Sequence, residues 1–137
     1  MDSGATDNYA QRNAPVEQVK PISNPSPIHL TNGSTMTASH ECILPNLPLI
    51  SKESKTAQLC PDSNNTTLIS VGKICDDDCT AVLSKRQCTI YKNKPFEPVL
   101  RAKRCPTTGM YVTRLSDPLL QNSFVSQQIK LANANLQ

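Results

Sequence analysis

The sequence predicts a mainly β fold with one helix near the C-terminus, and three observations support this prediction. The chain has 137 residues, which is room for one domain of ordinary size. Several short segments are rich in β-branched residues or alternate apolar with polar residues, and turn-forming residues separate them, as is typical of strands. Only 37% of the residues are hydrophobic and 4% are aromatic, so we expect a small core built from Val, Ile and Leu.

The first half of the chain contains one predicted β-hairpin between turn-rich stretches. Residues 7–27 hold four prolines among polar residues and predict a loop or a weak edge strand. In residues 28–44 apolar and polar residues alternate before Asn32-Gly33, a dipeptide that fits the two positive φ angles of a type I′ hairpin turn. Residues 45–66 are turn-rich again, with three prolines around a short apolar run.

The second half of the chain contains most of the predicted strands. Residues 66–74 are apolar and β-branched and are interrupted by Gly72, which favours a buried strand that ends at a tight turn. Residues 79–84 and 87–92 alternate on either side of a basic dipeptide and predict a second hairpin. Further strands are predicted over residues 98–103 and 109–115.

A helix is predicted over residues 118–135. The tripeptide Ser-Asp-Pro at residues 116–118 is typical of a helix start, with proline at the first helical position. Apolar residues then recur at a spacing of four, as in Leu120 and Phe124. This pattern indicates an amphipathic helix whose apolar face packs against the protein rather than against a membrane.

The charge and the N-terminal residues predict a protein with neither a nucleic-acid partner nor a membrane partner. The net charge is +3, and the 14 basic residues are scattered apart from the run Arg101, Lys103 and Arg104, which is too small for a nucleic-acid footprint by itself, so no direct contact with nucleic acid is expected. The N-terminus is polar and lacks an apolar run, which predicts no signal peptide, and no segment has the length of a membrane span. We therefore expect an intracellular, cytoplasmic protein.

Six cysteines and one acidic run are the candidate metal ligands. In a chain without a signal peptide, the cysteines are expected to be reduced, buried thiols. Cys75 and Cys79 could join two other ligands around zinc, but no second close cysteine pair exists. Asp76 to Asp78 could bind a hard cation, although three adjacent carboxylates without the spacing of an oxygen-ligand loop favour a solvated turn. We expect no metal and no cofactor.

The string Asp2-Ser3-Gly4-Ala5-Thr6 carries the clearest chemistry. An aspartic-peptidase loop needs a carboxylate, then a hydroxyl that can fasten the loop, then a glycine that lets the backbone approach the carboxylate. The same residues also form ordinary turns. One such string supplies only half of a catalytic pair of carboxylates.

Four motifs in a fixed order together resemble the retropepsin-like aspartic protease region of copia-type (Ty1/copia) retrotransposon polyproteins. After the Asp-Ser-Gly-Ala-Thr string come the hairpin motif of residues 28–34 and then Leu-Ile-Ser-Val-Gly at residues 68–72, which leads into the Lys-Ile-Cys-Asp-Asp-Asp-Cys string. Residues 109–115, Gly-Met-Tyr-Val-Thr-Arg-Leu, resemble the opening of the segment that precedes integrase in these polyproteins.

The resemblance implies a fold, an activity and a set of site residues. The fold would be a small acid-protease half-barrel with a flap hairpin. The activity would be that of an aspartic endopeptidase that processes its own polyprotein as a homodimer and needs no cofactor. The site residues would be a catalytic Asp2, the active-site loop residues Ser3 and Gly4, the substrate-flap residues Asn32 and Gly33, and Ile69 and Gly72 in the strand and turn that back the loop.

The resemblance also divides the chain. Residues 1–104 would form the protease domain, and residues 105–137 would form a linker and the start of the pre-integrase segment, with the predicted helix. Family members place an apolar strand before the catalytic aspartate, whereas here only Met1 precedes it, so we expect a domain that lacks its first strand. This departure suggests a truncated or degenerate copy, located in the cytoplasm or in a transposon-encoded particle.

Three other functions are consistent with the residues. The chain could be a catalytically inactive remnant that acts at most as a protein-interaction module. A cysteine protease would use His40 and Cys42, but the sequence offers no third residue to orient them. A small interaction module could use a weak polyanion-binding surface, for which a solvated surface is the simpler interpretation; its cations would be Lys73, Lys85, Arg86, Arg101, Lys103 and Arg104.

Overall fold

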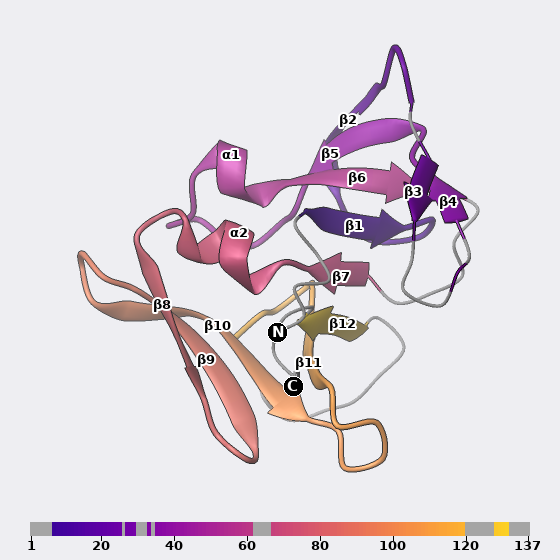
Figure 1. Ribbon diagram of the computed structural model, residues 1–137. Coiled ribbons are helices and arrows are strands. Elements are labelled where there is room, and N and C mark those ends of the chain that lie inside the picture. The colour runs from indigo at the N-terminus through magenta and orange to yellow at the C-terminus, as the bar shows by residue number, and fades with distance from the viewer. Residues whose placement is uncertain are drawn as a thin grey trace.

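The computed structural model describes residues 7–25, 27–29, 33, 35–61, 67–119 and 128–131. Within these residues the fold is mainly β, as the alternating patterns predict, with two short helices (Figure 1). The elements are β1 (Asn8–Gln11), β2 (Glu17–Pro21), β3 (Pro27–His29), β4 (Thr35–Thr37), β5 (His40–Ile43), α1 (Lys52–Lys55), β6 (Thr56–Cys60), β7 (Thr67–Ile69), α2 (Val71–Cys75), β8 (Cys79–Leu83), β9 (Gln87–Lys92), β10 (Glu97–Arg104), β11 (Tyr111–Arg114) and β12 (Gln128–Leu131).

Ten strands form one sheet in the order β2-β5-β6-β1-β7-β12-β11-β10-β9-β8, and β3 and β4 form a separate pair. Two pairings are parallel, those of β1 with β6 and of β12 with β7, and the other pairings are antiparallel. In Figure 1 the β3–β4 pair lies on the opposite side of the view from the ribbon of β8, β9 and β10.

Both predicted hairpins are confirmed, but the two-residue type I′ turn predicted at Asn32-Gly33 was wrong, because His29 lies opposite Thr35 and such a turn would place it opposite Met36. β3 and β4 are antiparallel, with Ile28 opposite Met36, and β8 and β9 are antiparallel, with Ala81 opposite Ile90. The strands predicted over residues 98–103 and 109–115 are present as β10 and β11. These elements were predictable because each combines an alternating pattern with a short turn to a neighbour that is close in sequence.

The prediction for residues 7–27 was half right. β2 is an edge strand, but β1 lies in the middle of the sheet between β6 and β7. The partners of β1 are distant in sequence, since Asn8 lies opposite Ala57 and Tyr9 lies opposite Leu68. Local composition does not indicate such pairing, because the partners come from two separate later segments.

The prediction of turns throughout residues 45–66 was wrong where α1 and β6 form. Ser51 caps α1 by accepting a hydrogen bond from the Ser54 amide, and the chain then continues directly into β6. β6 pairs with β5 on one side and with β1 on the other, so tertiary pairing outweighs the nearby prolines.

The predicted strand over residues 66–74 ends earlier than expected. β7 stops at Ile69, and the next residues form α2 rather than a strand and a tight turn. Ser70 explains the change, because its hydroxyl accepts a hydrogen bond from the Lys73 amide and caps the first turn of α2. α2 packs beside α1 and against β8 (Figure 1).

The helix predicted over residues 118–135 was wrong at residues 128–131, which form β12. This strand pairs with β11 on one side and with β7 on the other, and it joins the two halves of the sheet. Ile129 and Leu131 are two residues apart, a spacing that also fits a strand. The rest of the predicted helix beyond Leu119 lies outside the described residues.

The core is aliphatic, as the composition predicts, and it extends from β1 to β11. Its largest fully buried apolar side chains are Leu44, Leu47, Ile69, Ile74, Ile90, Leu100 and Leu115. The domain boundary expected after residue 104 falls between β10 and β11, which pair in the same sheet. Among the described residues, no helix has the length and the apolar character that crossing a membrane requires.

Candidate active site

The predicted site residues divide into two groups. Asp2, Ser3, Gly4 and Asn32 lie outside the described residues. Gly33, Ile69 and Gly72 are described. The structure therefore describes the residues that follow the Asp-Ser-Gly string, beginning at Asp7, and the segments that contact them.

Gly33 lies in the connection between β3 and β4, where the resemblance places the tip of the flap. Its φ angle is +87°, in the left-handed region that side chains other than glycine rarely adopt. The Asn-Gly signal thus marks a turn that needs glycine. The hairpin carries few buried groups, since Ile28 and Met36 are partly exposed and their neighbours in β3 and β4 are exposed.

Ile69 and Gly72 occupy different elements, although they were predicted as one strand and turn. Ile69 is fully buried at the end of β7 and belongs to the core. Gly72 is an exposed residue of α2. Between them, the backbone amide of Ser70 donates a hydrogen bond to the side chain of Asn8 in β1, shortly after the Asp-Ser-Gly string.

Asp7 is the first described residue after that string, and both oxygens of its carboxylate accept hydrogen bonds. One oxygen accepts hydrogen bonds from the Lys73 ammonium and from the Asn8 amide, and the other accepts one from the Gln58 side chain at 2.7 Å. The Lys73 ammonium also donates to the Thr56 carbonyl at 3.0 Å. The ion pair therefore ties the entry to β1 both to α2 and to the start of β6.

Asn8 completes this connection from inside the protein. Its side chain is fully buried, and its amide nitrogen donates to the carbonyls of Ser54 and Thr56 at 3.1 and 3.0 Å. Its side-chain oxygen accepts from the Ser70 amide at 2.8 Å. These three hydrogen bonds all join the Asn8 side chain to backbone groups. Asn8 therefore connects β1 to the segment of residues 54–56 and to Ser70.

We call Asp7, Asn8, Ser70 and Lys73 the anchor. The anchor holds the chain that leaves Asp2–Thr6 against the segment that contains Ser70 and Gly72, two regions separated by more than 60 residues. Asp7 and Asn8 were not among the predicted site residues. The available signal was a polar Asp-Asn pair at the start of a strand, because a buried polar side chain is normally hydrogen-bonded.

The thiols of the two most deeply buried cysteines are poor nucleophiles. Burial raises the pKa of Cys42 to about 11 and that of Cys88 to about 12. His40, two residues before Cys42 on β5, forms a hydrogen bond to the Ser39 hydroxyl at 2.6 Å. The Cys42 thiol instead donates to the Ala57 carbonyl at 3.6 Å, so this pair has the geometry of a packed strand.

The acidic run of residues 76–78 has a structural role at Asp77. One Asp77 oxygen accepts from the Ser51 amide at 2.7 Å and from the Lys92 ammonium at 3.0 Å. The hydrogen bond from the Ser51 backbone, with help from Lys92, lowers the pKa of Asp77 below its ordinary value. Asp77 thus links the start of α1 to the end of β9. No group of three His, Cys, Asp or Glu residues in the described part of the chain is arranged to hold a metal ion.

Replacing Asp77 with asparagine is expected to destabilise the fold by about 1 kcal/mol at pH 7, because a charge-assisted hydrogen bond becomes a neutral one. The pKa of Asp77 is lowered in the folded protein, so its contribution is present above the unfolded pKa and is lost as the pH falls through the folded value. Urea unfolding of D77N and of the original chain should therefore converge in acid. The matched control is D76N, since Asp76 is exposed; an equal effect of D76N would contradict the assignment.

Comparison of the chain with protein families, with curated proteins and with solved structures found no match.

Proposed function

We propose that this chain is the protease region of a copia-type retrotransposon polyprotein and acts as an aspartic endopeptidase. The observation that carries the proposal is the anchor. A catalytic carboxylate is useful only when the chain around it is held in place. Asp7 and Asn8 hold the chain that leaves Asp2, and they hold it against the Ile69–Gly72 segment that the motif pattern assigns to backing the loop.

The flap hairpin supports the same proposal. β3 and β4 pair outside the main sheet, and they carry exposed residues on a turn that needs glycine at Gly33. A hairpin with few buried contacts opens at low free-energy cost, which suits a segment that must move to admit a peptide.

The proposed mechanism uses two copies of Asp2, one from each subunit of a homodimer. Two carboxylates about 3 Å apart cannot both ionise cheaply, so the pair holds one proton. The charged member takes a proton from water, which attacks the scissile carbonyl carbon. The protonated member donates a hydrogen bond to the carbonyl oxygen and stabilises the developing negative charge.

A cleavage assay tests the proposal. The 137-residue chain is incubated at mildly acidic pH with a mixed peptide library, and new peptide termini are identified by mass spectrometry. We expect cleavage that pepstatin, an inhibitor of aspartic peptidases, suppresses. Absence of cleavage would favour the inactive remnant, and pepstatin-insensitive cleavage would identify a different kind of peptidase. Either result would overturn the proposal.

A further inference from the structure

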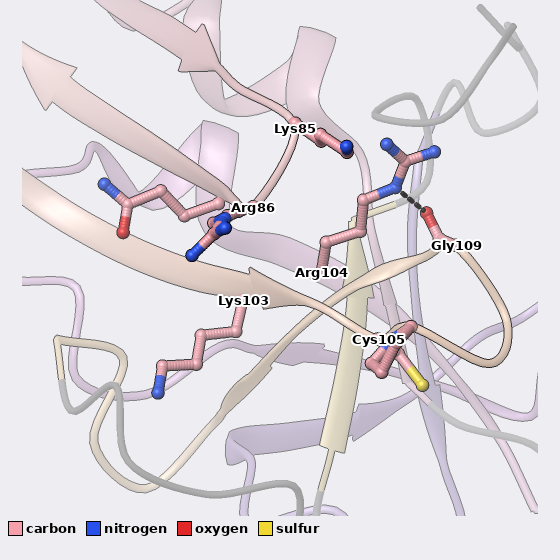
Figure 2. Close-up of a pocket in the computed structure, with 8 residues that line it drawn as sticks. Lys85, Arg86, Lys103, Arg104, Cys105 and Gly109 are labelled. Atoms are coloured by element: carbon pink, nitrogen blue, oxygen red, sulfur yellow. Dashed lines mark hydrogen bonds between the residues drawn. The ribbon is translucent and has the colours of Figure 1, made fainter.

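Four cationic side chains line one pocket at the end of the β9–β10 pair (Figure 2). We call it the basic pocket and define it by Lys85, Arg86, Lys103 and Arg104. The cavity has a volume of about 720 Å³, within the range of small-ligand sites. Its other lining residues are Gln87, Cys105, Pro106 and Gly109.

Strand pairing creates the basic pocket from two separate parts of the sequence. The turn between β8 and β9 places Lys85 and Arg86 at the start of β9, and β10 runs antiparallel to β9 with Lys103 opposite Gln87. The Arg104 amide donates to the Arg86 carbonyl at 2.8 Å. Cations that are 17 or more residues apart in sequence therefore become neighbours across the sheet.

The four cations lack acidic partners in the described part of the chain. The ion pairs found there join Lys20 to Glu41, Lys73 to Asp7 and Lys92 to Asp77, and none of them includes a residue of the basic pocket. All four pocket cations are exposed. Exposed cations without acidic partners favour an anionic ligand at this face of the protein.

Arg104 is the best positioned of the four. Its Nε donates to the Gly109 carbonyl at 3.0 Å, and its guanidinium lies 5.7 Å from the centre of the Tyr111 ring. These contacts fix the side chain and leave its terminal nitrogens as donors for a ligand. An arginine held in this way loses little conformational freedom on binding an anion.

The arrangement of the charges favours an extended ligand. In Figure 2 the ammonium of Lys103 lies well away from the guanidinium of Arg104, and the charged ends are spread across the pocket rather than converging on one point. A single phosphate ion could not contact all four. A chain with regularly repeated negative charge could, and a phosphodiester backbone carries one charge per nucleotide.

We infer that the basic pocket binds nucleic acid through its phosphodiester backbone. Among the described residues that line the cavity there is no aromatic side chain, so these residues offer bases no stacking surface and little base preference is expected. The scattered basic residues of the sequence predict no such contact, yet the fold gathers four of the six cations considered earlier. Lys73 is instead paired with Asp7. This inference does not depend on the proposed peptidase activity.

The test is fluorescence anisotropy with a labelled single-stranded oligonucleotide of mixed sequence, titrated with the full chain over a range of salt concentrations. With four phosphate contacts, the slope of log K against log salt should be about −2.8. In the double variant R86Q/K103Q the slope should weaken by about 1.4, and the affinity at low salt should fall roughly tenfold. Arg86 and Lys103 are exposed and their side chains make no ion pair within the described residues, so folding should be unaffected.

The matched control is K52Q/K94Q, which removes the same charge from two exposed lysines outside the pocket. We expect this control to keep most of the affinity. An equal loss in both double variants would overturn the inference, because the binding would then depend on net charge alone. Tighter binding of an oligo-glutamate peptide of equal charge would also overturn it and would identify an acidic peptide as the ligand.

Cys105 provides an internal reporter of occupancy. It lines the pocket and is partly exposed, and hydrogen bonds from the Thr108 side chain and from the amides of Thr107 and Thr108 lower its pKa. Bound oligonucleotide should therefore slow alkylation of Cys105 by iodoacetamide, a neutral reagent, in the original chain. Unchanged alkylation with the oligonucleotide bound would place the binding elsewhere and contradict the inference.

Discussion

Replacing Asp2 with asparagine is expected to lower kcat/KM for peptide cleavage by roughly 1000-fold, because the variant dimer loses both the base that activates water and the proton that is shared by the pair. The amide has nearly the same shape as the carboxylate, so folding and dimerisation should be retained. The rate is measured with the best peptide from the library, and the oligomeric state is measured by sedimentation.

The control for this prediction is D76N, which removes a carboxylate at an exposed position outside the anchor and the flap. D76N should cleave at the original rate. If D2N retains its cleavage while D76N is also active, Asp2 is not the catalytic group and the peptidase proposal is wrong.

Replacing Asn8 with alanine is expected to destabilise the folded chain by about 3 kcal/mol, since three largely buried hydrogen bonds to backbone groups would be lost. The affected groups are the carbonyls of Ser54 and Thr56 and the amide of Ser70. Of the three groups, the Thr56 carbonyl keeps its hydrogen bond from the Lys73 ammonium. The free energy of unfolding is measured by urea denaturation at pH 7.

Two further variants make the Asn8 prediction specific. N8D has the same shape but would direct an oxygen at two carbonyls, so it should be at least as destabilising as N8A. N93A removes an asparagine whose side chain forms exposed hydrogen bonds to Asp78 and Thr80, and it should cost well under 1 kcal/mol. Equal stabilities of N8A and N93A would contradict the role assigned to the anchor.

The parts of the fold that the sequence predicted are those whose partners lie nearby in the chain. The β3–β4 and β8–β9 hairpins follow from alternating residues around short turns. β10 and β11 could be placed by the same local pattern. In each case the side-chain alternation and the turn chemistry agree, so little information from distant residues is needed.

The parts that were not predicted depend on distant residues. β1 was expected to be a loop or an edge strand, but it lies between β6 and β7, and its only local indication is a polar Asp7-Asn8 pair. β12 was expected to be helical, and it becomes a strand where it pairs with β11 and β7. Propensity and periodicity are overridden in both cases by strand pairing across the sheet.

In the candidate site, too, features with a local sequence signature could be predicted, and features that depend on distant residues could not. The motif pattern predicts roles for the segment around Ser70 and for the hairpin that carries Gly33, because both have local signatures in the sequence. It did not identify the anchor, since Lys73 was considered only as a motif residue or a surface cation and Asp7 was not considered. The pairing of Lys73 with Asp7 depends on the position of β1 in the sheet.

A mixing experiment tests the central claim most directly, because each subunit of the proposed dimer supplies one Asp2. The original chain is kept at a fixed concentration well above that needed for dimerisation, and an equal amount of D2N is added. The cleavage rate should fall to about half, since half of the original chains then sit in mixed dimers with one carboxylate. An unchanged rate would contradict a shared pair of Asp2 residues and with it the proposed peptidase.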